Sequence, residues 1–234
     1  MMRLDKFLVA THTATRSEAK KMIKRGRVFI NDKKATSSDI KIDENQDIVT
    51  LDGNIINYSR YEYIMFNKPA GVVSATKDNT CKTVMDIINS PNRNLFPVGR
   101  LDKDTEGLML ITDDGALAHN LLAPGKHVDK TYFVRVEGVV TFATADAFAK
   151  GVIIDEDYLT KPARLEIINS DDISEVRVTI HEGRFHQIKK MFLSQNMKVI
   201  YLKRLSMKNL ILDENLEIGC FRKLTQSEID NLKC

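Results

Sequence analysis

Residues 99–115 read GRLDKDTEGLMLITDDG, a stretch in which three acidic side chains precede an almost uninterrupted apolar run. The acidic residues Asp102, Asp104 and Glu106 lie two apart, and the apolar run covers 108–111. A short apolar run bounded by turn residues is consistent with a strand that is buried on both faces. The acidic loop therefore lies at the mouth of a buried strand. There it could hold a metal, carry a catalytic carboxylate or form only a polar turn.

Strand and helix patterns follow each other in mixed order on both sides of this stretch. The predicted strands cover 62–67, 107–113, 130–138, 163–168, 175–183 and 198–207, and the predicted helices cover 83–89, 115–122, 142–149, 185–195 and 226–232. Several strands are adjacent without an intervening helix. This order predicts an α+β fold with a mixed, mainly antiparallel sheet rather than a doubly wound parallel one.

The first 55 residues have a pattern of their own. Thr15 and Glu18 have the spacing of a capping box, so a helix begins after Thr15 and ends near Gly26. A short helix comes before this helix, and a strand with a turn at 31–32 comes after it. A second strand ends the segment. We therefore predict a small basic domain of two helices and a sheet.

Charge is distributed unevenly along the 234 residues. The chain has a net charge of +3, but residues 1–34 hold ten Lys or Arg and three Asp or Glu, which leaves −4 for residues 35–234. A solvated helix face is the ordinary explanation of lysine-rich helices, yet a compact basic segment on a nearly neutral body favours nucleic-acid binding. The cations expected to bind RNA here are Arg3, Lys6, Arg16, Lys20, Lys21, Lys24, Arg25 and Arg27.

Composition excludes several classes of protein. The three cysteines, Cys81, Cys220 and Cys234, are odd in number and far apart, which predicts free thiols in a reducing cytosol and neither a disulfide framework nor a zinc site. The N-terminal residues do not resemble a secretory signal, and no apolar run is long enough to span a bilayer. We expect a cytoplasmic protein that does not bind membranes.

The acidic loop matches a calcium-binding loop only in part. The string DKDTEG, residues 102–107, matches the opening of a calcium-binding loop. The match then fails, because position nine is Leu110 and position twelve is Asp113 instead of glutamate. We therefore predict no metal, and the polar turn remains the competing interpretation.

The wider string FPVGRLDKDTEGLMLITDDG closely resembles the central motif of pseudouridine synthases, GRLDxxTxGL. The resemblance implies that Asp102 is the catalytic carboxylate. Further motifs of the family follow in its order: NKPAG at 67–71, KTY ending at Tyr132, and EGRFHQIKKM at 182–191 with Lys189 at its basic position. In this family the tyrosine packs on the target base and the basic residue pairs with the aspartate.

The N-terminal segment resembles the small RNA-binding domain first known from a small-subunit ribosomal protein, of the S-four type. Its matching strings are RLDKFL, SEAKKMIKRGRVFIND and DIVTLDG. Together the two resemblances cover essentially the whole chain and point to the RsuA-type branch. They imply an RNA-binding domain at 1–55, a linker at 56–61 and a catalytic domain at 62–234.

This branch acts on ribosomal RNA, and LTKPARLEII with the His-Gln pair of RFHQIKKM resembles the members that act on small-subunit RNA. The expected partner is ribosomal RNA or a small-subunit precursor, bound by a monomer. Two alternatives stay open: a large-subunit pseudouridine synthase, and an RNA-binding assembly protein without activity.

Pseudouridine formation breaks the bond between ribose C1′ and uracil N1 and rejoins the base through C5, so it requires neither cofactor nor metal. Asp102 could attack C1′ or remove the C2′ proton, and both routes need it ionised. Burial alone would raise its pKa, so a cation such as Lys189 is needed. Arg100 lies two residues earlier on the same side of an extended segment and would reach RNA. The RNA-binding residues expected in the catalytic domain are Lys68, Arg100 and Arg184.

Overall fold

The computed structural model describes residues 1–11, 13–44, 46–56, 58, 60–92 and 94–233. The chain forms two compact units, Met1–Tyr61 with Pro91–Arg93, and Glu62–Ser90 with Asn94–Cys234. Cys234 and two positions of the predicted linker, 57 and 59, lie outside the described residues. The predicted domain boundaries stay a prediction, although the last strand of the first unit ends at Ile56, one residue beyond the expected end of that domain.

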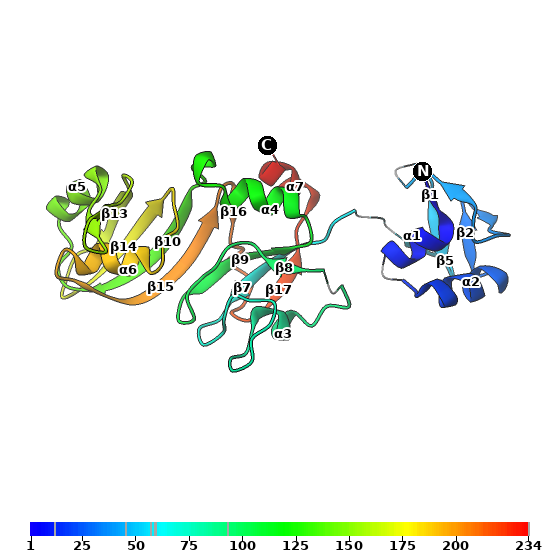
Figure 1. Ribbon diagram of the computed structural model, residues 1–234, viewed down its shortest axis with the longest axis horizontal. Coiled ribbons are helices and arrows are strands. Elements are labelled where there is room, and N and C mark those ends of the chain that lie inside the picture. The colour runs from blue at the N-terminus through cyan, green and yellow to red at the C-terminus, as the bar shows by residue number, and fades with distance from the viewer. Residues whose placement is uncertain (12, 45, 57, 59, 93, 234) are drawn as a thin grey trace. The chain divides into compact units, whose positions relative to one another are not determined.

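The first unit contains the predicted two helices and small sheets (Figure 1). Its elements are β1 (Met2–Arg3), α1 (Leu4–Ala10), α2 (Arg16–Lys24), β2 (Val28–Ile30), β3 (Lys33–Lys34), β4 (Lys41–Ile42), β5 (Val49–Leu51) and β6 (Asn54–Ile56). Strands β3-β2-β5-β6 form one antiparallel sheet, and β1 pairs with β4. The buried core comprises Leu4, Phe7, Leu8, Ala19, Ile23, Val28, Ala35, Ile42 and Val49.

Two local sequence signals of this unit are confirmed. The Thr15 side chain accepts a hydrogen bond from the Glu18 backbone N–H, and the Glu18 carboxylate accepts one from the Thr15 N–H at 2.8 Å, which is a capping box. Asn31 and Asp32 have φ values of 48° and 64° in the turn between β2 and β3. Two successive turn residues with positive φ give a backbone twist that matches the twist of the two strands in a β-hairpin.

The second unit is built on a nine-stranded sheet in the order β13-β14-β10-β15-β9-β7-β17, with β16 and β8 paired to β15 and β9 (Figure 1). Its strands are β7 (Tyr63–Lys68), β8 (Phe96–Pro97), β9 (Glu106–Thr112), β10 (Lys130–Glu137), β13 (Arg164–Asn169), β14 (Ile173–Ile180), β15 (Lys198–Met207), β16 (Leu210–Ile211) and β17 (Phe221–Lys223). A two-stranded hairpin is separate and consists of β11 (Ile153–Ile154) and β12 (Tyr158–Leu159). All pairings in the large sheet are antiparallel except that of β9 with β15, so the predicted mixed, mainly antiparallel sheet is confirmed.

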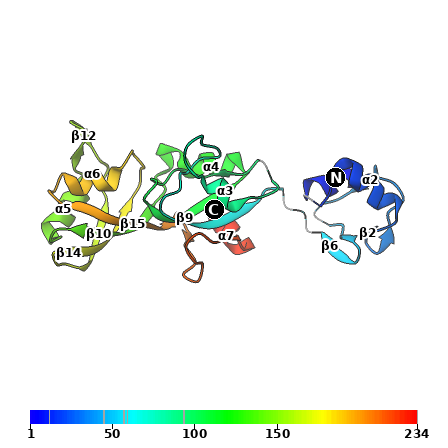
Figure 2. The same cartoon turned by 90° about the horizontal axis from the view of Figure 1, so that it is seen from below.

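The helices of this unit are α3 (Val84–Ile88), α4 (Gly115–Leu122), the short 3-10 helix η1 (Pro124–Lys126), α5 (Phe142–Lys150), α6 (Gln187–Leu193) and α7 (Gln226–Lys233). Helix α5 lies against β13 and helix α6 against β15. Figure 2 shows both helices beside the part of the sheet that contains β10, β14 and β15. Their Phe148 and Phe192 rings lie 4.9 Å apart in the buried core, together with Val134 and Val136 of β10. None of the described helices has the length and apolar character needed to cross a membrane.

The parallel pairing of β9 with β15 joins the two halves of the sheet, β13-β14-β10-β15 and β9-β7-β17. The pairing covers two residue pairs, Glu106 with Lys203 and Gly107 with Arg204. Gly107 has a φ of +98°, and an added Cβ would lie 2.3 Å from the Arg204 carbonyl oxygen. Only glycine fits this position, because the backbones approach too closely and φ is positive. We call this short parallel pairing the sheet junction.

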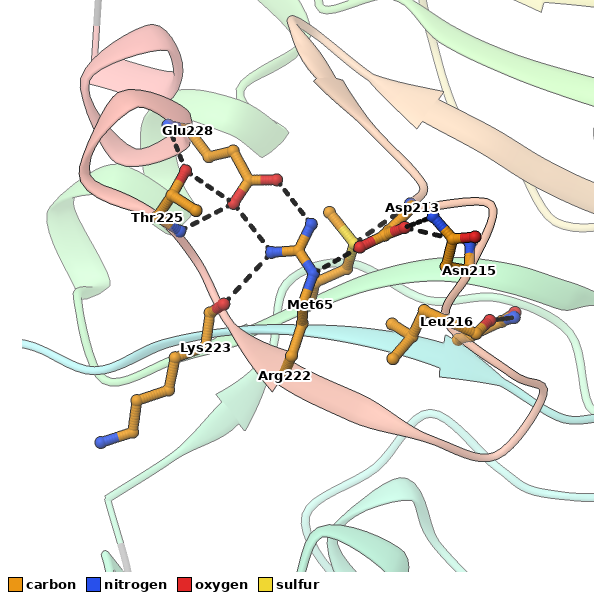
Figure 3. A network of polar contacts seen from close by, with 9 residues as sticks. Met65, Asp213, Asn215, Leu216, Arg222, Lys223, Thr225 and Glu228 are labelled. Atoms are coloured by element: carbon orange, nitrogen blue, oxygen red, sulfur yellow. Dashed lines mark hydrogen bonds and ion pairs between the residues drawn. The ribbon is translucent and has the colours of Figure 1, made fainter.

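Strand β17 was not predicted from the sequence. It holds two charged residues and no apolar alternation, and it becomes a strand by pairing with β7. Arg222 at its centre donates hydrogen bonds to Asp213 (Nε, 2.8 Å) and to both carboxylate oxygens of Glu228 on α7 (2.9 and 2.8 Å) (Figure 3). The Thr225 N–H donates to Glu228 as well, at 2.7 Å. The network thus fixes α7 to the edge of the sheet.

We expect the Arg222 network to make the free energy of unfolding depend on pH. The hydrogen bond from Arg222 chiefly lowers the pKa of Glu228 from 4.5 to about 2. A depressed pKa stabilises the folded state fully above the unfolded pKa, and this contribution is lost as pH falls toward 2. Glu228→Gln should lower the free energy of unfolding by about 1–2 kcal/mol at pH 7. Denaturant titration should show this deficit shrinking at pH 3.

Glu214→Gln is the matched control, because Glu214 is exposed. It should have little effect at either pH. A Glu228→Gln deficit that is equal at pH 7 and pH 3 would contradict the assignment.

Candidate active site

The acidic loop runs directly into β9 and is pinned to the loop after β7. The Ser74 hydroxyl donates to the Leu101 carbonyl at 2.7 Å, and the Leu101 N–H donates back to Ser74 Oγ at 3.0 Å. The Thr105 N–H donates to the Asp102 carbonyl at 3.1 Å, which closes a turn. The Leu101 side chain is buried, whereas the Asp102 carboxylate is partly exposed. Hydrogen bonds on both sides of Asp102 therefore hold its backbone in place ahead of β9.

Lys68 also holds this loop, and it does not lie where the sequence prediction placed it. It is fully buried, and its Nζ donates to the carbonyl oxygens of Pro69, Asp102, Lys103 and Thr105 at 3.0, 3.1, 3.3 and 2.8 Å. Burial lowers its pKa to about 8, against the opposing charges of the nearby carboxylates. The expected RNA contact at Lys68 is therefore wrong: the ammonium group binds the backbone of the catalytic loop and is inaccessible to RNA.

Lys189 lies close to Asp102, as the motif order implied. Its Nζ is 3.3 Å from Asp102 Oδ2, and it donates to both oxygens of Asp104 at 2.6 and 2.9 Å. Burial alone would lower the pKa of Lys189, but the hydrogen bond to Asp104 and the two carboxylate charges outweigh it, so the pKa is raised. Lys189 is therefore a cation at neutral pH. The His186 ring is a further neighbour, with Nε2 3.7 Å from Asp102 Oδ2.

The loop before α6 positions these groups. Gln187 accepts a hydrogen bond from the Arg184 N–H at 3.0 Å and donates to Glu182 at 2.8 Å. His186 has a φ of 54°, so α6 begins at Gln187 and not at 185 as predicted. The Arg184 guanidinium carbon lies 3.3 Å from the centroid of the Tyr158 ring, a close cation–π contact.

Tyr132 on β10 completes a narrow slot at Asp102. The slot has a volume of about 70 Å³, and its lining includes Asp102, Tyr132, Lys189, Arg100 and Arg184. The structure thus brings together the three expected catalytic residues and the two exposed arginines that were expected to bind RNA. The Tyr132 side chain is almost fully buried, so one wall of the slot is a fixed aromatic surface.

Asp102 and Asp104 share Lys189 as a partner, whereas Glu106 has a different one. Asp104 pairs with Lys189, and Glu106 accepts a hydrogen bond from the Tyr201 hydroxyl at 2.7 Å. Burial, and then this bond, raises the pKa of Tyr201 to about 12. Among the residues that the structure describes, no group of three or more His, Cys, Asp or Glu side chains is arranged to hold a metal ion.

Two regions of the chain match known protein families. Residues 62–194 match the family described as RNA pseudouridylate synthase, and residues 2–48 match the S4 domain. The uncharacterized RNA pseudouridine synthase YtzG of Bacillus subtilis is 42% identical over 97% of both chains. The chain belongs to the RNA pseudouridylate synthase family. It is an RNA pseudouridine synthase, an isomerase, with an S4 domain at its N-terminal end.

Further relatives of this synthase carry more specific names. The ribosomal small subunit pseudouridine synthase A of Haemophilus influenzae is 40% identical over 99% of both chains, and that of Escherichia coli K12 is 40% identical over 97% of this chain and 98% of its own. A crystal structure of a pseudouridylate synthase superposes with a TM-score of 0.69 at 38% identity, covering 99% of this chain and 100% of that one. The predicted RsuA-type relationship is confirmed, and the alternative of a protein without activity is wrong.

The S4 domain of the synthase presents most of the predicted RNA-binding cations to solvent. The exposed members are Arg3, Lys6, Arg16, Lys20, Lys21, Lys24 and Arg25. Arg3 and Arg27 are different, because Arg3 donates two hydrogen bonds to Asp5 and Arg27 forms an ion pair with Asp52. Each of these charges is already paired with a carboxylate at the surface of the domain, and their RNA contacts stay a prediction.

Proposed function

We propose that this synthase converts a uridine of small-subunit ribosomal RNA to pseudouridine, with Asp102 as its catalytic carboxylate. The observation that carries the proposal is the Asp102–Lys189 ion pair of 3.3 Å at the Tyr132 slot. The names of the relatives in Haemophilus influenzae and Escherichia coli support the small subunit as the source of the RNA.

In this proposal Asp102 acts as an anion on the ribose. It attacks C1′ to give a sugar ester, or it removes the C2′ proton to give a glycal, and in both routes the C1′–N1 bond breaks. The base then turns and C5 bonds to C1′. In the ester route this displaces the Asp102 carboxylate from C1′, and in the glycal route Asp102 returns the proton to C2′. The proton on C5 is then lost while N1 gains one. Lys189 places a positive charge 3.3 Å from the carboxylate, where it balances the negative charge of Asp102 once the substrate excludes water from the slot.

The target uridine must leave its stack to reach Asp102, as in other enzymes that modify a base. Tyr132 would then pack on the extruded uracil. Base–aromatic stacking contributes about 1–3 kcal/mol. We therefore expect Tyr132→Phe to retain most RNA affinity and Tyr132→Ala to lose it by about 5- to 150-fold, measured as the dissociation constant for a substrate RNA. Equal losses in both variants would assign the role to the hydroxyl group instead.

The S4 domain at residues 1–55 is proposed to bind the surrounding RNA through phosphate contacts, which add affinity but little sequence information. Replacing Lys20, Lys21 and Lys24 with alanine should weaken RNA binding and lower the log–log salt slope by about one per lost phosphate contact. The rate constant at saturating RNA should be retained. An unchanged salt slope would show that these exposed lysines are only a solvated helix face.

Mapping pseudouridines in ribosomal RNA tests the proposed substrate. RNA from cells with and without this chain should differ at one uridine of the small-subunit RNA, and the wild-type gene, but not one encoding Asp102→Asn, should restore it. A difference confined to large-subunit RNA would overturn the small-subunit assignment and leave the isomerase activity intact.

A further inference from the structure

A second, larger cavity adjoins the Asp102 slot. It has a volume of about 700 Å³, which is ten times that of the slot, and shares the walls formed by Arg100, Tyr132 and Arg184 with it. Its innermost cation is Arg204 on β15, and we call it the Arg204 cavity. A volume of this size is typical of a site for a small organic molecule, since such sites measure about 300–1,000 Å³.

Arg204 is buried without a full set of hydrogen-bond partners. It pairs in register with Tyr132 on the neighbouring strand, so the two side chains share one face of the sheet. The residue is 2% exposed, and its Nε donates to the Leu108 carbonyl at 2.7 Å. Its Nη2 atom is buried and has no hydrogen-bond partner within the described part of the chain. Leaving a buried charged donor unpaired is costly, so the site is built to receive an acceptor.

Lys130 adds a second inner cation. It lies two residues before Tyr132 on β10 and therefore on the same face, and its Nζ donates to the Val128 carbonyl at 3.0 Å. Burial, and then the charge of Arg204, lowers its pKa. Two cations that face the same cavity repel each other, and an anion between them would remove that repulsion.

The remaining walls do not neutralise these charges. The carboxylate of Glu182 lines the cavity, but it already accepts hydrogen bonds from the Tyr158 hydroxyl (2.8 Å), the Lys161 N–H (3.0 Å) and the Gln187 amide (2.8 Å). Lys161, Arg100 and Arg184 add three more cations to the lining, and Pro97, Leu121, Leu122 and Val128 add apolar surface. The cavity therefore combines an apolar wall with an excess of positive charge.

We propose that the Arg204 cavity binds a second nucleotide of the substrate RNA, next in the strand to the target uridine, with its phosphate at Arg204 and Lys130. The base of that nucleotide packs against the apolar wall. An inorganic anion would leave this wall without a contact. The shared Tyr132 wall requires the two nucleotides to be neighbours. The inference rests on the proposed function, because it takes the Asp102 slot as the position of the target uridine.

A charge-removal cycle on a short RNA tests the assignment. The probe is AAUAA, whose single uridine sets the register, made with each of its four phosphodiesters replaced in turn by a neutral methylphosphonate. Calorimetry with the full-length wild type should find one linkage next to the uridine whose neutralisation weakens binding about tenfold. Lys130→Met should weaken binding of the unmodified RNA by a similar factor and should no longer distinguish that linkage.

Lys198→Met is the matched control, because Lys198 is an exposed lysine on β15 that does not line the cavity. It should show the wild-type pattern at all four linkages. Arg204→Lys, which keeps the charge and loses the planar fork, should reduce the sensitivity to the same linkage, with thermal unfolding as the check that it folds.

The inference is overturned if the wild type binds AAUAA no more tightly than uridine monophosphate. It is also overturned if neutralising each linkage weakens binding to the wild type and to Lys130→Met by the same factor. A different result would contradict the proposed function: ribosomal RNA treated with the wild type would contain no pseudouridine. An active wild type with four equivalent linkages would therefore remove the flanking-nucleotide site and leave the proposed function in place.

Discussion

Replacing Asp102 with asparagine is expected to abolish pseudouridine formation while RNA binding persists. The substitution keeps the size of the side chain and removes its charge and basicity, so neither attack on C1′ nor removal of the C2′ proton remains possible. We expect the single-turnover rate on ribosomal RNA to fall by at least about four orders of magnitude. The dissociation constant for the same RNA should stay within a few-fold of the wild-type value.

Asp104→Asn tests whether the reaction needs the Asp102 carboxylate itself or only negative charge in the loop. Asp104 also contacts Lys189, but its side chain is 72% exposed. Exposed ion pairs contribute about 0–1 kcal/mol, so the rate should fall by less than about tenfold. Equal losses in the two variants would contradict the special role of Asp102, and near-normal turnover by Asp102→Asn would remove it altogether.

Lys68→Met is expected to have the second largest effect, on both activity and stability. The methionine fills a similar volume but cannot bind the four carbonyl oxygens that Lys68 gathers beneath the catalytic loop. Losing hydrogen bonds from a charged donor should lower the free energy of unfolding by about 1.5–3 kcal/mol. A displacement of Asp102 by about 1 Å can reduce the rate about 100-fold, and we expect a loss of that order at saturating RNA.

Lys82→Met is the control for Lys68→Met, because Lys82 is exposed in the same unit. It should leave both the unfolding midpoint and the rate near their wild-type values. If Lys68 instead contacted RNA, its variant would lose affinity and salt dependence and keep the rate at saturation. That outcome would restore the RNA-binding role predicted from the sequence.

Local signals in the sequence predicted most of the fold. The capping box at Thr15, the turn at Asn31–Asp32 and the long strands of the catalytic unit depend on neighbouring residues, and all are present. Strand β17 was missed because its charged residues form a strand only through pairing with β7, which is far away in the sequence. Short edge strands of this kind carry no periodicity of their own.

The candidate site, like the fold, was predicted only where the sequence carries a local signal. Motif order brought Asp102, Tyr132 and Lys189 into one prediction, and the structure places them around one slot. Lys68 was misplaced because a lysine after an apolar strand reads as a surface cation. All six residues of β7 are buried in the structure, but the sequence gives no local sign of it, because the strand ends on the polar residues Asn67 and Lys68. Arg204 was missed because nothing local marks an arginine of a long strand as buried.

The sheet junction has a mechanical consequence for the active site. Asp102 precedes β9 in one half of the sheet, whereas Tyr132 and Lys189 belong to β10 and α6 in the other. Backbone pairing between the halves covers two residue pairs. The Asp102 carboxylate and the Lys189 ammonium group come from opposite sides of this short pairing, so their ion pair is itself a link between the two halves. Losing either charge therefore removes a tie across the sheet as well as a group from the site.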